Sequence, residues 1–330
     1  DYEVPNLAAD DTRYDLVYLE AWQQPVTAVE DAELFEAALG GTDTTTRIRN
    51  MARVKLYTKQ GLSEYNCKSY WEDLIGSIKG TTNAEISEQQ ELIPKTTLKV
   101  TYSDEGESND LCSSSIGGDY LGAENQAIRV QLTGDNKFTW GFDNASSLYR
   151  IELSDSSKSL DTFKLITAPK DEHHWPLAGK VVEILPWSAI LANREKTAEL
   201  TGHFSKVKTS YDPDTSELTI EDPLISADFG KEWTNRSDSA EIGQPTEYLF
   251  MRVWDRGSDL TSDPNIAIDG PKIPLGNTGI LVTISGAYQQ EGDYWIIAAR
   301  PETPGQVVPW ELEIQNGIFP HGIRRYFAPL

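Results

Sequence analysis

An alternating pattern over residues 127–142 constrains the fold of this chain more than any other stretch. The run AIRVQL alternates apolar and polar residues, a Gly-Asp-Asn turn follows at residues 134–136, and the run KFTWGF resumes the alternation. Alternation on both sides of a turn predicts a β-hairpin. A further alternating run at residues 148–153 predicts a third strand, which would complete a meander with an aromatic face. No nucleophile, metal ligand or phosphate-binding loop stands out here, so this stretch is informative about the fold and not about a chemical activity.

Similar patterns predict further strands and two short helices. Strands are expected at residues 14–22, 47–57, 97–102, 248–255 and 279–301. Residues 30–39 and 69–79 carry apolar side chains at helical spacing, and Gly40 follows the first of these segments as a stop signal. The sequence therefore predicts a mainly β fold, with an antiparallel sheet or sandwich domain that carries two short helices.

Residues 177–226 differ in character, because short β-type runs alternate with turns at a spacing typical of a small closed barrel. We expect this barrel to be an inserted domain, since longer alternating strands return after it. A chain of 330 residues is long enough for two domains. The predicted organisation is an extended arm over residues 1–13, a discontinuous main β domain over 14–176 and 227–308, the inserted β-barrel, and a C-terminal strap over 309–330.

The 52 acidic residues outnumber the 29 basic ones and give a net charge of -23. This excess repels phosphate backbones and anionic lipid head groups, so we expect neither nucleic acid nor a membrane surface as a partner. Calcium stays open as a ligand, but no motif supports it, and we predict no cofactor. No apolar run reaches membrane-spanning length, no signal peptide is visible, and the start at Asp1 without Met suggests a fragment.

Cys67 and Cys112 are the two cysteines of the chain. They are too few for a zinc cluster or a disulfide framework. They could form one disulfide if the protein leaves the cytoplasm, or both could be small buried residues.

Common catalytic signatures are missing from the sequence. It contains no nucleophile elbow, no dinucleotide or phosphate-binding glycine loop and no zinc-protease helix. The run DEHHW at residues 171–175 is the one local cluster of metal-capable side chains, but adjacent histidines on an extended chain point to opposite faces. A solvated turn is the favoured interpretation, and the isolated His203 and His321 are expected to be structural. We therefore predict no enzyme, with no catalytic, cofactor-binding or metal site.

The aromatic content leaves an alternative function open. Paired carboxylates could hydrolyse glycosides, and exposed tryptophans could stack against sugars. The tryptophans considered for this role are Trp140, Trp187, Trp233, Trp254 and Trp295, although aromatic residues at strand spacing usually pack in a core. The alternative is a secreted acidic module that binds or cleaves carbohydrate, with surface glycans as partners and two or more exposed tryptophans in a concave patch.

Residues in the best-defined motifs are candidates for contacts with other proteins. Glu124, Asn125 and Gln126 precede the hairpin, and their simpler interpretation is that they satisfy backbone groups where a loop enters the sheet. The other candidates are Trp140, Asp143, Asn144, Asp293, Tyr294 and Trp295. The arginines on predicted strands are expected to pair internally with carboxylates; these are Arg47, Arg129, Arg252 and Arg300.

Four separated stretches carry a resemblance to a known family. They are YLEAW at residues 18–22 continuing to ALGGTDT at 38–44, GAENQAIRVQL followed by KFTWGFDNAS, GDYW at 292–295 continuing to AR at 299–300, and the closing YFAPL. In this order they resemble the signature of an uncharacterised bacterial domain family, associated with phage tails and extracellular contractile injection systems. The matches span most of the chain, each of them is short, and the family has no assigned activity.

The resemblance implies a structural or adaptor component of a phage-tail-like or contractile injection assembly, such as a baseplate, tail-tip or accessory part. Such a component acts through protein–protein surfaces, with other subunits or further copies of itself as partners. It would belong to a virion-like or extracellular particle assembled in the bacterial cytoplasm, whereas the carbohydrate alternative implies a secreted or cell-surface location. A third option is a surface-layer or fibre-forming protein that assembles without partners.

Overall fold

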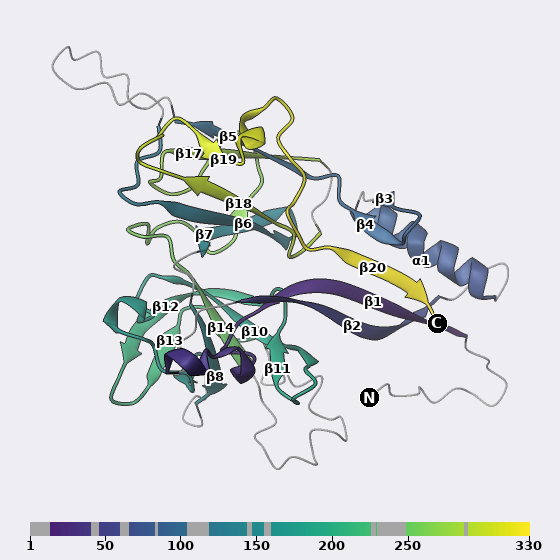
Figure 1. Cartoon of the computed structure of the whole chain (residues 1–330), viewed down its shortest axis with the longest axis horizontal. Coiled ribbons are helices and arrows are strands. Elements are labelled where there is room, and N and C mark those ends of the chain that lie inside the picture. Colours follow the sequence, from purple (N-terminus) through teal and green to yellow (C-terminus); the bar gives the residue numbers. More distant parts are fainter. Residues whose placement is uncertain are drawn as a thin grey trace.

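The computed structural model describes residues 14–40, 46–59, 66–82, 85–103, 119–143, 147–154, 160–225, 229, 249–286 and 290–330. This part of the chain is mainly β and is built from antiparallel sheets with one α-helix, which confirms the predicted fold class. Figure 1 shows a sandwich, a barrel below it, and a long hairpin that projects sideways toward the helix. The predicted arm over residues 1–13 lies outside the described residues.

The sandwich packs a five-stranded sheet of order β15-β7-β6-β18-β19 against a three-stranded sheet of order β16-β17-β5. Its strands are β5 (Thr97–Tyr102), β6 (Gln126–Gly134), β7 (Lys137–Phe142), β15 (Ile266–Ala267), β16 (Ile273–Pro274), β17 (Ile280–Ser285), β18 (Tyr294–Ala299) and β19 (Val307–Val308). Side chains from both sheets, including Leu98, Trp140 and Trp295, share one buried core. The aromatic face of the predicted hairpin therefore faces this core.

The predicted hairpin over residues 127–142 is confirmed as β6 and β7. Asp135 and Asn136 form its turn with φ angles of 48° and 61°. Asn and Asp adopt this left-handed region more readily than other residues with a side chain, and two-residue hairpin turns with the twist of the strands require it. The Asn136 side-chain amide also donates to the carbonyl of Ile268 at 2.8 Å, which ties the turn to the segment after β15.

The predicted third strand of the meander forms, but it belongs to another sheet. β8 (Leu148–Leu153) pairs with β9 (Thr162–Leu165) and β14 (Leu249–Trp254) and does not pair with β7. Its inward side chains, Tyr149 and Ile151, lie in the barrel core. The meander prediction was wrong because alternation shows that a strand has an apolar face, but does not show which of two apolar cores it joins.

The seven-stranded sheet closes into a barrel, because β10 pairs with both β12 and β14. Its remaining strands are β10 (Val181–Ile190), β11 (Lys196–Ala198), β12 (His203–Asp212) and β13 (Glu217–Ile220). Residues 177–226 supply these four strands, whereas β8, β9 and β14 come from outside that segment. The core joins both sources, since Phe163 and Met251 pack with Val207. The barrel therefore extends beyond the predicted insertion, because four strands alone would leave its core open.

A third sheet of order β2-β1-β20-β4-β3 contains the projecting hairpin. Its strands are β1 (Asp15–Val26), β2 (Arg47–Thr58), β3 (Glu85–Ile86), β4 (Glu91–Ile93) and β20 (Arg325–Pro329). β20 lies between β1 and β4, so the last strand of the chain pairs with the first. The strap predicted over residues 309–330 therefore ends in a regular strand, because the backbone groups of β20 fill the gap between β1 and β4.

One of the two predicted helices forms an α-helix. α1 (Cys67–Thr82) includes the predicted residues 69–79, and its buried Tyr70 and Leu74 pack against the inner side of β1. Cys67 is exposed at its start. Cys112 lies outside the described residues, so the disulfide stays a prediction.

The other predicted helix, over residues 30–39, is replaced by 3-10 turns at Ala32–Leu34 and Ala37–Leu39. The buried carboxylate of Glu30 accepts from the Ala198 N–H at 3.0 Å, and Asp31 accepts from the Asn193 side chain at 2.8 Å. These bonds hold the start of the segment against the barrel, and extended Phe35 separates the two turns. Among the described residues, further 3-10 turns lie at Glu172–His174 and Trp310–Glu313.

A buried ion pair connects the hairpin sheet to the sandwich. Arg325 Nη1 on β20 donates to Asp293 Oδ1 at 2.9 Å, just before β18, and both side chains are almost fully buried. Arg325 Nη2 also donates to the Glu291 carbonyl at 2.6 Å. Burial raises the pKa of Asp293 to about 6, and the nearby Arg325 charge opposes that rise. The carboxylate is therefore stable in its charged form only while Arg325 accompanies it.

We expect Arg325→Met to lower the free energy of unfolding by about 3–5 kcal/mol at pH 7.5, because it leaves a buried carboxylate without its counter-charge. The folded-state pKa of Asp293 already lies above its ordinary value, and the variant raises it further. The folded variant therefore binds a proton more readily than the unfolded chain, and the loss shrinks as the pH falls from 7.5 to 5. Urea unfolding at both pH values measures this change.

The double variant Asp293→Asn/Arg325→Met serves as the control, because it has no carboxylate to titrate at this position. It should lack the recovery of stability that Arg325→Met shows as the pH falls, and its deficit relative to wild type should grow slightly from pH 7.5 to pH 5, because wild-type Asp293, with a pKa of about 6, itself binds a proton over this range. A loss in Arg325→Met that is equal at both pH values would contradict the role assigned to the pair.

Candidate functional site

The aromatic motif residues lie inside the sandwich. Trp140 and Trp295 are fully buried. Trp295 Nε1 donates to the Ile318 carbonyl at 2.9 Å, and the rings of Trp140 and Phe142 pack edge to face with centroids 5.9 Å apart. These tryptophans build the core, and a partner protein cannot reach them.

The acidic and aromatic residues near β18 are also held within the protein. Asp293 binds Arg325, as described above, and the Arg129 guanidinium stacks 3.8 Å from the ring centroid of Tyr294. Arg129 also approaches the half-exposed Asp143 at 3.6 Å. Internal pairing of strand arginines is thus seen at Arg129.

The other three strand arginines differ in their surroundings. Arg252 Nη1 lies 3.3 Å from the buried carboxylate of Glu183, which also accepts from Trp254 Nε1 at 2.9 Å. Neither Arg47 nor Arg300 forms an ion pair with a described carboxylate. The predicted internal pairing therefore applies to Arg129 and Arg252.

The polar residues before the β6–β7 hairpin differ in their contacts and exposure. The Glu124 carbonyl accepts from the Tyr120 hydroxyl at 3.3 Å, and Gln126 starts β6 opposite Ala299. The side chains of Glu124 and Asn125 are exposed. Asn144 lies outside the described residues, so its predicted contact is not described by the structure.

The potential metal ligands are occupied by protein contacts. Asp171 accepts from the backbone N–H groups of His173 and His174 and lies 2.7 Å from the His174 ring. The isolated histidines are structural, since His203 bonds to a backbone carbonyl and His321 accepts from a backbone N–H. Within the described ranges, no three His, Cys, Asp or Glu side chains gather to hold a metal ion.

The Asp-rich loop after β14 is organised by an arginine. The buried Arg256 guanidinium donates to the carbonyls of Asp263 at 2.8 Å and Pro264 at 3.1 Å, and its Nε donates to the Trp140 carbonyl at 2.9 Å. Carbonyl oxygens are groups that calcium would use as ligands. In this loop the guanidinium of Arg256 binds these carbonyl oxygens.

The outer face of the β1–β2 hairpin is the most distinctive surface. Here, "hairpin face" means the side chains of Val17, Leu19, Ala21, Gln23, Pro25, Ile48, Asn50, Ala52, Val54 and Leu56. They face each other across the two strands in register, as in the pairs Leu19 with Val54 and Ala21 with Ala52. Ile48 is 64% exposed and Val54 is 58% exposed. A sheet face of this composition is normally buried in a soluble protein.

Charged side chains are sorted to the other side of the hairpin. Arg49, Arg53 and Lys55 all occupy odd positions of β2, which face inward beside the even positions of β1. Arg49 pairs with Asp31, Arg53 Nη2 with Glu199 at 2.7 Å, and Lys55 with Glu20 at 2.5 Å. Strand alternation therefore puts the ion pairs inside, and the charged residue on the outer side of the two strands is Asp15, at the end of β1 opposite Thr58.

The ion pairs and two small apolar clusters attach the inner side of the hairpin to α1 and to the barrel. Toward one end, Leu16 and Tyr18 pack against α1, and toward the other, Trp22 and Met51 pack against the barrel residue Leu191. The hairpin is thus held from behind. Its outer face is covered by no described element.

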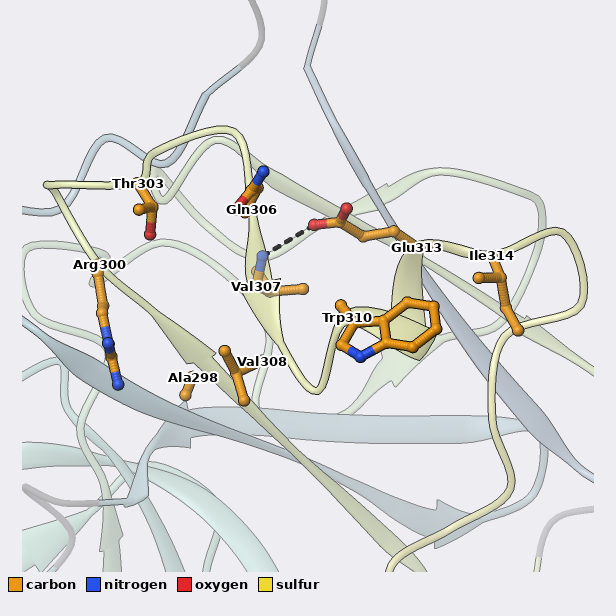
Figure 2. Close-up of a pocket in the computed structure, with 9 residues that line it drawn as sticks. All are labelled: Ala298, Arg300, Thr303, Gln306, Val307, Val308, Trp310, Glu313 and Ile314. Carbon is orange, nitrogen blue, oxygen red and sulfur yellow. Dashed lines mark hydrogen bonds between the residues drawn. The ribbon is translucent and has the colours of Figure 1, made fainter.

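A hollow beside β19 is a second candidate site. Its volume is about 490 Å³, and Figure 2 shows Arg300 at one end and Trp310 at the other, with Val308 between them. Glu313 Oε1 shapes the wall by accepting from the Val307 N–H and the Tyr102 hydroxyl, each at 2.8 Å. Trp310 is 66% exposed. The hollow therefore offers one aromatic platform and one cation.

The other described tryptophans do not add a second platform. They are buried or half-buried: Trp22, Trp71, Trp140, Trp175, Trp187, Trp254 and Trp295. Trp233 lies outside the described residues. The described surface therefore lacks the pair of exposed tryptophans that the carbohydrate alternative predicts.

Comparison with known proteins adds no relative. No family model, curated protein or solved structure matches this chain. Among the described residues, no helix is both long enough and apolar enough to cross a membrane. The function must therefore be argued from the surfaces of the protein.

The sequence did not reveal the hairpin face, because charged side chains usually face water and here they face the protein. In the run RIRNMARVK, basic residues alternate with uncharged ones, and such a pattern normally predicts that the charged side faces water. The carboxylates that draw these basic side chains inward include Asp31 and Glu199, which are distant in sequence. Only the fold brings them together.

We expect Val54→Lys to change the free energy of unfolding by about 1 kcal/mol or less, because this side chain is exposed and contributes only its strand preference. Met51→Ala, on the opposite side of β2, should cost about 2–5 kcal/mol, because it leaves a cavity in a packed cluster. Urea unfolding of both variants makes the comparison. A larger loss in Val54→Lys than in Met51→Ala would show that the hairpin face is part of the core.

Proposed function

We propose that this protein is a structural or adaptor component of a multi-protein assembly and that it docks on another subunit through the hairpin face. One observation carries the proposal: a regular two-stranded sheet face exposes apolar side chains and carries a charge only at its end, where Asp15 lies opposite Thr58, in a chain with 81 charged residues among 330. Exposed apolar surface costs free energy that burial against a partner recovers. An interaction surface accounts for the sorting of side chains across the hairpin.

The rigidity of the hairpin supports a docking role. β1 and β2 pair over 12 residues without a break in register, and the inner side is held by ion pairs and packed side chains. A surface that is already ordered loses little conformational freedom on binding. Figure 1 shows the hairpin projecting from the sandwich and the barrel, where a neighbour can approach it.

The resemblance to phage-tail and contractile-injection proteins suggests the type of assembly. We propose a baseplate, tail-tip or accessory part in a virion-like or extracellular particle, with other subunits as partners. The absence of catalytic motifs in the sequence favours a role that depends on surfaces. This identity of the particle rests on the short sequence matches, whereas the docking role rests on the hairpin face.

The carbohydrate alternative depends on a single described feature. Trp310 and Arg300 flank the hollow beside β19, and an exposed indole can stack on a sugar ring. One aromatic platform is a weaker basis than an extended apolar sheet face. A glycan array that gives no binder for the intact protein would remove this alternative.

The double variant Ile48→Lys/Val54→Lys tests the docking role. We expect at least a roughly tenfold loss of this chain from the sedimenting native particle, equivalent to about 1.4 kcal/mol or more, because two ammonium groups would be buried against the partner. Quantitative mass spectrometry of the sedimented and soluble fractions measures the distribution.

Ile166→Lys is the matched control, because Ile166 is an exposed apolar residue, at 55%, that follows β9 and is not part of the hairpin face. It should sediment like wild type. If wild type is found in no large assembly, or if the double variant sediments as well as Ile166→Lys, the proposed function is wrong.

A further inference from the structure

The hairpin face has a shape that suits packing against a second sheet. Its side chains form cross-strand pairs that run from Val17 with Leu56 to Pro25 with Ile48. The middle pair consists of two alanines, Ala21 and Ala52, and larger side chains lie on both sides of it. Packed sheets lie about 10 Å apart, with side chains of both filling the space between them. Small residues at the centre therefore allow a second sheet to approach closely.

The pattern of the face matches itself when one copy is reversed. In such a stack the alanine pairs of the two copies meet, and the strands of one copy run opposite to the same strands of the other. Ile48 of each copy then lies over Leu56 of the other, since both are four residues from Ala52, on opposite sides of it. Ile48 is 64% exposed and Leu56 is 37% exposed, so each covers the other. The contact would therefore bury apolar surface at both of its ends.

The two ends of the hairpin carry opposite charges. Asp15 is the first residue of β1 and Arg47 is the first residue of β2, so they lie at opposite ends of this antiparallel pair. Arg47 is exposed and forms no ion pair with a described carboxylate. A reversed second copy brings its Arg47 to the end that holds Asp15, and this happens at both ends of the contact. A copy stacked in the same direction would place like charges together, which disfavours association.

The neighbours of the hairpin also favour the reversed stack. The barrel and α1 lie toward opposite ends of the hairpin (Figure 1), where Trp22 packs on the barrel residue Leu191 and Leu16 packs on α1. A reversed copy places its barrel beside the α1 end of the first copy. A copy stacked in the same direction would place both barrels at one end of the contact, where they would compete for the same space.

We propose that two copies of this chain pack through their hairpin faces about a two-fold axis, with the strands of one copy reversed on those of the other. This inference rests on the proposed function and identifies the subunit that the hairpin face meets. Both copies use the same patch, so the contact closes at a dimer and does not continue into a fibre.

The size of the face predicts a weak and reversible dimer. The 12 paired positions of two strands cover a strip of roughly 40 Å by 10 Å on each copy, or about 800 Å² for both before the relief of the side chains is counted. Stable specific interfaces bury roughly 1,200 Å² or more, and weaker, transient ones bury less. We therefore expect a Kd in the micromolar range.

Sedimentation equilibrium of the purified chain measures this dimer directly. Between about 1 and 300 µM, the mean mass should rise from 36.8 kDa toward twice that value. Each copy has a net charge of -23, so the copies repel each other and salt screens that repulsion. Raising NaCl from about 0.05 M to 0.5 M should lower the Kd at least roughly threefold. A constant monomer mass, a Kd that rises with salt, or growth beyond a dimer would overturn the proposal.

Exchange of the end charges tests whether the occupant is a second copy. Asp15→Lys puts a cation near Arg47 of the other copy, and Arg47→Glu puts an anion near Asp15, so each variant should raise the Kd about threefold. The double variant Asp15→Lys/Arg47→Glu exchanges both charges and should restore the wild-type Kd. Asp214→Lys and Lys208→Glu, at exposed barrel positions, make the same changes in net charge and should stay within about twofold of wild type. A double variant weaker than both single variants would contradict the reversed stack.

The face itself is tested with variants already matched for exposure. Ile48→Lys/Val54→Lys should raise the Kd of the dimer at least roughly tenfold, because its ammonium groups would be buried against the second copy. Ile166→Lys should dimerise like wild type. Equal dimerisation of these two proteins would show that the contact lies elsewhere.

The purified chain and the native particle separate this inference from the function on which it rests. If purified wild type stays monomeric while Ile48→Lys/Val54→Lys is lost from the particle, the hairpin face meets a different subunit; the dimer is wrong and the docking role stands. If wild type dimerises through the face but occurs in no large assembly, the dimer stands and the proposed function is wrong.

Discussion

The pairing of the last strand with the first is the interaction on which the rest of this structure depends. β20 fills the gap between β1 and β4, and the segment before it crosses the sandwich, where Ile318 bridges to Leu98 and Gly322 to Tyr294. The buried Arg325–Asp293 pair then connects the strand to the turn before β18. Because loop-closure entropy rises only slowly with length, joining β1 to the distant β20 costs little more than joining nearer segments. Without β20, the hairpin sheet would have a gap at its centre.

That attachment determines what the hairpin can do. The carboxylates of Asp31 and Glu199 draw the basic side of β2 toward the protein, and alternation then turns its uncharged side outward. These ion pairs are only partly buried, since the side chains of Arg49 and Lys55 are 36% and 39% exposed. The same sorting of side chains leaves the apolar side of β2 facing outward.

Local patterns predicted those parts of the fold that depend on neighbouring residues. The β6–β7 hairpin, the strand over 97–102 and α1 follow from alternation, turn residues and helical spacing. β8 belongs to the barrel, although its apolar face would fit either core. Residues 30–39 form 3-10 turns and no α-helix, because Glu30 and Asp31 bind groups that are distant in sequence. The candidate site residues divide in the same way. Trp140 and Trp295 were chosen from conspicuous motifs and serve the core, while Ile48 and Val54 belong to an ordinary strand pattern and line the surface.

The sequence alone determined that this protein is mainly β, acidic and built around an aromatic hairpin, because composition and period-two alternation act over a few residues. The tertiary structure decided which core each strand joined, that β1 and β20 pair in one sheet, and which side of β2 faces water. Those outcomes depend on pairings between segments far apart in the chain, such as Arg53 with Glu199 and Tyr18 with Pro329. The alternation of a strand does not by itself show which of its two faces is buried, and contacts with residues distant in sequence decide this.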